Sequence, residues 1–390
     1  MKIHNPYRNV DWNSYKPHRT ELHCHTSASD GKADFGEMIE AYYAAGYDCL
    51  AITDHGIVDR SWTEPNFRLL SRLLTLQKHP FRKSAGLTEE RFREINEGVG
   101  RDGRRMLRVP FGTEHSPGGG KWAHVCSWFG DTPSAAIGKA DYTKAVCRAD
   151  SAGALCVINH PTSSMKNYDH PRAALYESEQ TSYVDRVQQL LEQYPSLLGI
   201  DIPSTEDRKL WDILLRRLAP SSRNVFAIAT TDGHEIQEIE KGRGWVEAMM
   251  PENTVGNLRQ CLEDGAFFAT SRYVSFIRTP ELIAAYPGLR ESIAAYPSML
   301  PTPQEDLYFN RRPIDAPRPM VTKITVKDDV ISILADNCDI ILWVTEGKYI
   351  ASGGSLTLAG CEGLGTYVRA ELWGPGGNLY TQPFLLQYEA

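Results

Sequence analysis

Hydrophobic and polar positions follow one repeating pattern over most of this chain. Up to about residue 265, short apolar runs of strand length alternate with longer amphipathic segments. Several of the apolar runs are continuous, which suits strands buried on both faces of a parallel sheet. This alternation is typical of a closed or nearly closed parallel β/α architecture. The predicted strands cover about 19–24, 49–55, 105–113, 122–129, 154–159, 197–201, 225–234 and 245–250.

Helices are predicted between these strands. Asp34 and Glu37 have the spacing of a capping box, and Gly46 ends the amphipathic segment that they open. A charged stretch at 57–104 reads as an insertion, either a solvated surface or a lid over the site. The other predicted helices cover about 65–79, 88–98, 141–152, 178–194, 205–219 and 254–264.

The pattern changes beyond residue 280. Residues 281–318 are rich in proline and have little periodicity, which indicates a connecting segment. Residues 319–390 contain short strand-like runs separated by glycine turns, and they predict a small antiparallel, sandwich-like β domain. We interpret this domain as a stabilising or dimerising module. The barrel domain is then residues 1–280.

The polar residues at the ends of the predicted strands are of the types that commonly bind metal ions. His23 and His25 lie two positions apart, so on a strand they share a side at roughly 6.5 Å, while Cys24 points away and packs as a thiol. Active sites of β/α barrels collect at the C-terminal strand ends, and His124 is the exception to that placement. Imidazole with carboxylate suits Zn, Fe or Mn. The candidates, enough for two or three ions with one bridging carboxylate, are His23, His25, Asp30, His55, Glu114, His124, His160, Asp232 and His234.

Composition narrows the classes of function. A formal net charge of −7 argues against a general nucleic-acid or membrane-surface binder. None of the eight cysteines forms a Cys-x-x-Cys pair, and most lie in apolar runs, which indicates reduced and buried thiols. The sequence contains no apolar signal core and no run of membrane-spanning length. We therefore expect a soluble, cytoplasmic protein.

The motifs of residues 18–275 resemble, in the expected order, those of the polymerase and histidinol phosphatase (PHP) superfamily. The run 264–272 also resembles a barrel-closing segment of its predicted phosphoesterase branch, and the C-terminal β domain is similar to additions in that branch. The motifs are His23-x-His25, Ser29-Asp30-Gly31, Thr53-Asp54-His55, Gly112-x-Glu114, His124, Asn159-His160-Pro161 and Thr231-Asp232-Gly233-His234.

This resemblance implies a distorted (β/α)7 TIM-like barrel with a trinuclear metal centre. Some family members have histidine where this chain has Asp30, a difference that would affect metal preference more than reaction type. Carried over by position, the three ions would be held by His23, His25, Glu114 and Asp232, by Asp30, His55 and His234, and by Glu114, His124 and His160.

The expected reaction is hydrolysis of a small phosphate ester, of the nucleotide or sugar phosphate class, by a metal-bound hydroxide. Asp54 is expected to act there, as a partner that orients a metal-binding histidine or as a proton carrier. Phosphate recognition needs cations outside the metal ligands. The candidates near the motif loops are Lys121, Arg243, Arg272 and His170.

Two other functions remain open from the sequence. A metal-dependent amidohydrolase that cleaves a C–N bond would use a similar barrel and a similar His-x-His motif. Such enzymes often have a bridging lysine on a middle strand, whereas Glu114 takes the bridging place here. A non-catalytic barrel that binds metal or nucleotide is the third possibility, although such proteins are expected to lose ligands and this chain retains all nine types.

Overall fold

Two sheets carry the strands that surround the predicted site. A computed structural model gives the fold, and it describes residues 1–65, 84–116, 123–132, 142–168, 181–241, 243–274, 310–311 and 315–388. In the first sheet, β2 (Lys16–Glu21), β3 (Cys49–Leu50) and β4 (Leu107–Arg108) are parallel neighbours. The antiparallel strands β10 (Trp245–Met250) and β11 (Phe267–Ser271) follow β2 in that sheet.

The second sheet has the order β5-β6-β7-β8-β9. The predicted parallel arrangement is wrong for β6, which is antiparallel to both β5 and β7. Only residues 116–124 separate β5 from β6, and this is too short for the crossover that parallel neighbours need. The strands are β5 (Thr113–His115), β6 (Val125–Trp128), β7 (Leu155–Ile158), β8 (Leu197–Asp201) and β9 (Phe226–Ile228).

The described strands do not pair into the closed barrel that was predicted. Two isolated parallel bridges join the sheets instead, one between Cys24 and Gly233 and one between His55 and Glu114. The predicted third strand is divided between β4 in one sheet and β5 in the other. The architecture is therefore mixed α/β with several sheets, and the two bridges hold the sheets together beside the predicted metal ligands.

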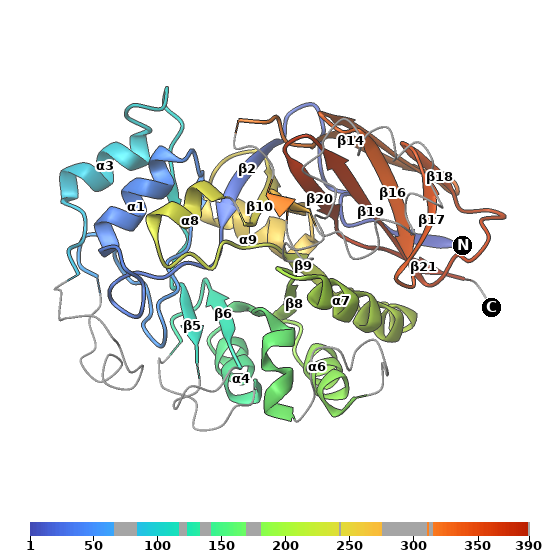
Figure 1. The fold of residues 1–390 in the computed structure, drawn as a ribbon, viewed down its shortest axis with the longest axis horizontal. Helices are drawn as coiled ribbons and strands as arrows, with labels where there is room; N and C mark the ends of the chain where they lie inside the picture. The colour runs from blue at the N-terminus through green and yellow to red at the C-terminus, as the bar shows by residue number, and fades with distance from the viewer. Residues whose placement is uncertain are drawn as a thin grey trace.

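Helices cover the outer faces of these sheets (Figure 1). In α6, Tyr183, Val187 and Leu190 are buried at helical spacing, and the N-cap hydroxyl of Thr181 accepts a hydrogen bond from the amide of Val184. The predicted helix near 65–79 falls almost wholly outside the described residues. The helices are α1 (Phe35–Ala44), α3 (Glu89–Glu97), α4 (Thr143–Ser151), α6 (Ser182–Gln193), α7 (Thr205–Leu218), α8 (Ile236–Lys241) and α9 (Val255–Asp264), with 3-10 turns at Pro161–Tyr168 and Ala219–Ser221.

The C-terminal strands lie together at one end of the molecule (Figure 1). The sequence runs 321–326, 330–335, 339–344, 367–373 and 383–388 predict five of them, and the short β17, β18 and β20 were not predicted. They are β14 (Met320–Lys327), β15 (Val330–Asp336), β16 (Ile340–Thr345), β17 (Lys348–Ser352), β18 (Ser355–Thr357), β19 (Tyr367–Gly374), β20 (Gly377–Thr381) and β21 (Phe384–Gln387), and a separate short pair is formed by β12 (Tyr273–Val274) and β13 (Asn310–Arg311).

One eleven-stranded sheet crosses the predicted boundary between the two domains. β20 pairs with β11, so the C-terminal strands β16, β17, β19, β20 and β21 continue the sheet that contains β2, whereas β14, β15 and β18 form a separate three-stranded sheet. The first residues of the chain also join it, because β1 (Lys2–His4) pairs with β21. The domain boundaries at 280 and 319 stay a prediction.

Two further expectations concern the cysteines and membranes. All eight cysteines are free, and five of them, including Cys24 and Cys126, are buried. Within the described part of the chain, no helix has both the length and the apolar character needed to cross a bilayer.

Candidate metal centre

The chain leaves β2 and enters the site at once. The imidazole Nε2 atoms of His23 and His25 lie 3.1 Å apart, and both rings are fully buried. Cys24 turns the other way, as predicted: its thiol packs against the carbonyl of Ala51, with an Sγ–O distance of 3.4 Å. A backbone hydrogen bond from His25 to the carbonyl of Gly233 holds this segment against the loop that follows β9.

Two carboxylates complete a compact set with these imidazoles. Nε2 of His23 lies 3.2 Å from Glu114 Oε1 and 3.3 Å from Asp232 Oδ1. Nε2 of His25 lies 3.5 Å from Glu114 Oε2 and 3.4 Å from Asp232 Oδ1. Ligands about 2.1 Å from a tetrahedral ion are about 3.4 Å from one another. Five of the six pairs among these four side chains thus have the spacing of ligands around one ion.

A second set surrounds the carboxylate of Asp30. Oδ2 of Asp30 lies 3.3 Å from His55 Nε2 and 3.5 Å from His234 Nε2. Oδ1 of Asp30 lies 3.6 Å from His25 Nδ1. The rings of His25 and His234 stack with their centroids 4.4 Å apart, so this set directly adjoins the first.

Glu114 lies at the centre of the whole arrangement. Its Oε1 is 3.1 Å from His124 Nδ1 and 3.6 Å from His160 Nε2, and its Oε2 is 2.8 Å from His55 Nδ1. The amide of Asn159 donates a hydrogen bond of 2.7 Å to Oε1. Glu114 thus touches members of every set, as a bridging carboxylate would.

The position of His124 follows from the direction of β6. Because β6 is antiparallel to β5 and β7, its beginning lies beside their ends: His115 pairs with Val125, and Val125 pairs with Ile158. His124 immediately precedes β6 and is therefore at the same edge as Glu114 and His160. The reversed direction of β6 therefore explains why His124 reaches the site although it does not lie at the C-terminal end of a strand.

All nine predicted ligands belong to groups whose ligand atoms lie within 4.8 Å of one another. These groups divide the residues somewhat differently from the division carried over by position. His25 joins the set around Asp30, and His55 joins Glu114 and His124. The groups are His25, Asp30, His55 and His234; His23, His160 and Asp232; His23, His25 and Glu114; and His55, Glu114 and His124.

Burial and neighbouring charges set the protonation of these groups. Burial, reinforced by the neighbouring His234 and His55, lowers the pKa of His25 to about 4. Burial opposes ionisation of Glu114, but the surrounding imidazoles hold its pKa well below its usual range. Burial lowers the pKa of His234 while Asp30 and Asp232 raise it, and the net value is about 9. Near pH 7 the carboxylates are thus ionised and His25 is neutral, whereas His234 is protonated and would release its proton on binding a metal ion.

The site fits divalent ions on its own chemistry. Oε2 of Glu114 is buried and accepts no hydrogen bond within the described residues, although His55 Nδ1 lies 2.8 Å away. Such an oxygen is costly to bury without a partner. A bound ion would satisfy it. Nitrogen and oxygen donors without thiolate suit Zn, Mn or Fe.

Asp54 supports the loop that carries Asp30. Its carboxylate is buried and accepts hydrogen bonds from the Thr26 amide at 2.8 Å, the Thr26 hydroxyl at 2.6 Å and the Ser29 hydroxyl at 2.5 Å. Ser29 Oγ lies 3.4 Å from His25 Nδ1 and 3.2 Å from Asp30 Oδ1. The contacts match the orienting role, acting through Ser29, more closely than that of a proton carrier.

The predicted phosphate-binding residues are placed less clearly. Burial raises the pKa of Asp201 to about 7, and the charge of Arg243 is among those that oppose this rise. Arg243 itself is exposed. Arg272 is 8% exposed, and its guanidinium donates hydrogen bonds of 3.4 Å to the carbonyls of Ala316 and Gly376, close to the C-terminal strands. Lys121 and His170 lie outside the described residues.

Two supporting residues had no role assigned from the sequence. Asn159 belongs to a quoted motif, but its bonds to Glu114 and to the thiol of Cys126, at 2.9 Å, depend on the register between strands. Glu21 is fully buried and accepts hydrogen bonds from the amides of His23 and Thr231. Its position two residues before His23, on the same side of the strand, was the available signal.

Comparisons with known proteins find structural similarity at low sequence identity. No protein-family model matches the sequence, and no curated protein matches it. The chain is similar in structure to a two-domain protein from Bacteroides vulgatus, described as containing a predicted PHP-like metal-dependent phosphoesterase, with 14% identity, a TM-score of 0.45, and coverage of 100% of this chain and 92% of that chain. It is also similar to a protein from Bifidobacterium adolescentis, described as a candidate metal-dependent phosphoesterase, with 12% identity, a TM-score of 0.32, and coverage of 55% of this chain and 87% of that chain.

Proposed function

We propose that this protein is a metal-dependent phosphoesterase that hydrolyses a small phosphate ester of the nucleotide or sugar phosphate class. In this proposal the two bridged sheets correspond to a distorted barrel, and three divalent ions occupy the metal centre. The proposal rests on one observation above all: five distances of 3.1–3.5 Å connect the ligand atoms of His23, His25, Glu114 and Asp232.

Bound divalent ions would lower the pKa of a water and stabilise the negative charge that develops on a phosphoryl group. The side chains have distinct tasks around them. His23 and His25 offer nitrogen lone pairs from buried, fixed rings. Glu114 is held in place by the amide of Asn159, so its two oxygens keep their directions between the histidines.

Behind these ligands, hydroxyl groups orient the rings. Ser116 Oγ lies 2.6 Å from His55 Nδ1, which leaves Nε2 of that ring directed at Asp30. Asp54 acts on the first loop by holding Thr26 and Ser29. We assign Asp54 a positioning role within this proposal.

The substrate would add its phosphate to the open side of the centre. The side chain of Asp30 is 37% exposed and that of His234 is 32% exposed, whereas His23 and Glu114 are inaccessible. A phosphate therefore has access from the side of Asp30 and His234. The exposed Arg243 is the described candidate for a cation that meets it.

Metal analysis combined with a substrate panel tests the proposal. We expect protein purified without chelator to contain two to three equivalents of Zn, Mn or Fe and to hydrolyse phosphomonoesters or phosphodiesters. Glu114→Gln should lose at least one equivalent and about a hundredfold or more in kcat/KM. The exposed Glu97→Gln is the matched control and should keep both.

The panel also distinguishes the competing functions. Activity on cyclic amides alone would contradict a phosphoesterase and favour a metal-dependent amidohydrolase. Full metal content without hydrolysis of any phosphate ester or amide would favour a non-catalytic metal-binding protein. Absence of bound metal in both chelator-free and metal-supplemented protein would contradict all three.

A further inference from the structure

The backbone of His160 is strained. Its φ is 30°, in the left-handed region that residues other than glycine rarely adopt. It also precedes Pro161, and a proline favours an extended backbone at the residue before it. Such a conformation persists only where the surrounding structure holds it. The contacts of the residues that follow His160 should therefore show what holds it.

This backbone conformation places the ring of His160 among the predicted ligands. Its Nε2 lies 3.6 Å from Glu114 Oε1, and its ring stacks with that of His23 at a centroid distance of 5.9 Å. The preceding residue is fixed to the neighbouring strand, because the amide of Asn159 donates to the carbonyl of His124 at 3.0 Å. Rotation about φ moves Cβ relative to that fixed residue. An extended backbone at His160 would therefore direct the ring elsewhere.

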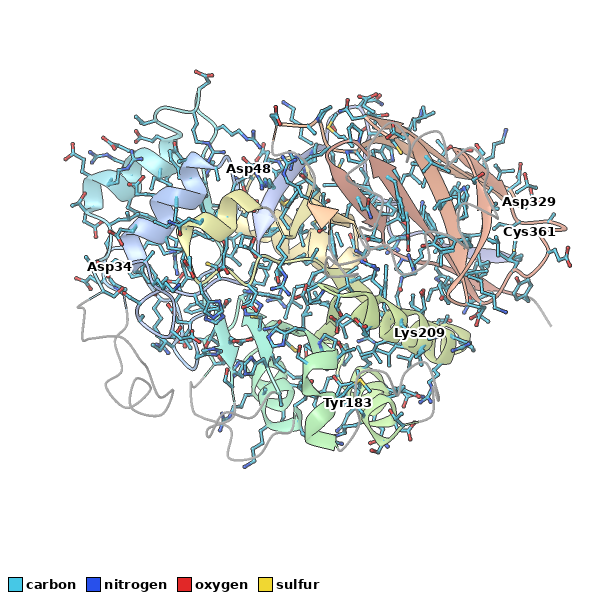
Figure 2. The ribbon with its side chains drawn as sticks, in the orientation of Figure 1. Asp34, Asp48, Tyr183, Lys209, Asp329 and Cys361 are labelled. Carbon is cyan, nitrogen blue, oxygen red and sulfur yellow. The ribbon has the colours of Figure 1, made fainter. Side chains whose placement is uncertain are left out.

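Two side chains from distant elements hold the residues after His160. The hydroxyl of Tyr183, at the start of α6 and labelled in Figure 2, donates a hydrogen bond of 2.6 Å to the carbonyl of Pro161. Oδ1 of Asp207, in the first turn of α7, accepts two hydrogen bonds from Thr162, at 2.8 Å from its amide and at 2.7 Å from its hydroxyl. Asp207 and Thr162 are each 1% exposed. These bonds fix the turn that begins at His160.

The other carboxylate oxygen of Asp207 caps α7. Oδ2 accepts hydrogen bonds from the hydroxyl of Ser204 at 2.5 Å and from its amide at 3.2 Å, and the Ser204 hydroxyl accepts from the amide of Asp207 at 3.1 Å. This is a capping box. The cap uses Oδ2 and leaves Oδ1 for Thr162. With four hydrogen bonds accepted, the direction of the carboxylate is fixed.

We propose that Asp207 is a positioning residue of the metal centre. By holding Thr162 it keeps His160 in its strained backbone conformation, and thereby retains the ion that His160 helps to bind. This inference rests on the proposed function, because it assigns a role within the same centre. Asp207 is not itself among the predicted ligands, so its loss would act through His160.

The crystal structure of metal-free Asp207→Ala tests the positioning without metal or substrate. The amide and hydroxyl of Thr162 lose their acceptor in this variant. We expect a negative φ at His160, with its Nε2 more than about 4.5 Å from Glu114 Oε1, too far for the two to share an ion. A positive φ with the ring still beside Glu114 would overturn the proposal.

Metal binding measures the consequence. Asp207→Ala should lose about one equivalent of metal, or bind its weakest ion about tenfold or more less tightly in competition with a fluorescent chelator. Asp207→Asn keeps an oxygen that Thr162 can use, so it should bind metal as the unchanged protein does. Asp212→Ala removes another buried carboxylate of α7 and is the matched control, which should lose stability but no metal.

Three results of the binding measurement would overturn the proposal: full metal content and affinity in Asp207→Ala, an equal loss in Asp207→Asn, or an equal loss in Asp212→Ala. If Asp207→Ala does not fold, Thr162→Val keeps the side-chain shape and removes one of the two bonds. It should weaken metal binding less, and unchanged affinity would contradict the proposal. Neither readout uses a substrate, so a metal-loaded protein that hydrolyses no phosphate ester would contradict the proposed function alone.

Discussion

The predicted ligands of the candidate metal centre are oriented by uncharged side chains that hydrogen-bond to them. Asn159 is the clearest case, because its side-chain amide joins Glu114 Oε1, at 2.7 Å, to the thiol of Cys126, at 2.9 Å, and Asn159 is fully buried. The amide fixes the orientation of the carboxylate that touches every ligand set. Its loss should therefore weaken metal binding without removing a ligand.

Asn159→Ala is expected to lower metal affinity about tenfold to a hundredfold. The measurement is competition with a fluorescent chelator, which reports binding without reference to any substrate. Asn13→Ala, at an exposed position, is the matched control and should leave the affinity unchanged. Equal affinities for the two variants would contradict the positioning role of Asn159.

At the residue scale, the sequence predicts donor atoms better than supporting contacts. His23 and Asp232 are identified by residue type and by their places at strand ends, and the structure brings all nine such residues together. Asn159 could not receive a role this way, because its bond to Glu114 exists only once β5, β6 and β7 are in register. Ser29 and Ser116 received no role either, because their contacts with Asp54 and His55 join segments that are distant in the sequence.

At the scale of elements, the turn after His25 positions Asp30. Gly31 packs so closely there that an added Cβ would lie 2.6 Å from the carbonyl oxygen of His25 and 2.8 Å from the Cα of Thr26. Both neighbours are backbone atoms, so they cannot rotate away. Any larger residue must displace the loop that carries Asp30.

Gly31→Ala is expected to lose about one equivalent of metal and about 1–3 kcal/mol of unfolding free energy. Elemental analysis and chemical denaturation measure the two effects. Gly256→Ala in α9 is the matched control, because no atom lies within 4 Å of the added Cβ, and it should keep its metal content and lose no stability. A Gly31→Ala protein with full metal content would show that the loop can move without losing Asp30.

The elements also show which signal in the sequence decides strand direction. Alternation of strands and helices predicts parallel pairing, but the nine residues between β5 and β6 leave no room for a crossover helix. Connection length, read together with periodicity, would have predicted the reversed β6 and with it the place of His124. Pro110 and Gly112, which interrupt the run 105–113, are the corresponding signal for its division into β4 and β5.

At the scale of the whole molecule, the C-terminal strands form buried hydrogen bonds with α7, a helix of the part that contains the candidate metal centre. Arg369 of β19 donates two hydrogen bonds of 2.9 Å to the carboxylate of Asp212 on α7, and Tyr367 donates a third of 2.8 Å. The guanidinium is 2% exposed. Pairing between strands so distant in sequence, such as β1 with β21, leaves no local pattern, which is why the shared sheet was not predicted.

Asp212→Ala is expected to lower the unfolding free energy by about 3 kcal/mol or more, because Arg369 keeps a buried charge with less compensation. Chemical denaturation followed by tryptophan fluorescence measures it. Asp185→Ala removes an exposed pair with Arg217 and should cost less than about 1 kcal/mol. Adding Arg369→Met to Asp212→Ala together with Glu371→Gln, since Glu371 is the other carboxylate that pairs with Arg369, should recover part of the loss, and a further loss instead would contradict the assignment to an uncompensated charge.

Anomalous X-ray diffraction from crystals grown with Mn or Zn tests most directly the claim that these side chains share bound ions. We expect a peak about 2.0–2.2 Å from Nε2 of His23, Nε2 of His25 and carboxylate oxygens of Glu114 and Asp232, with further peaks beside Asp30 and His124. Metal-loaded crystals with no anomalous peak among these residues would contradict the account.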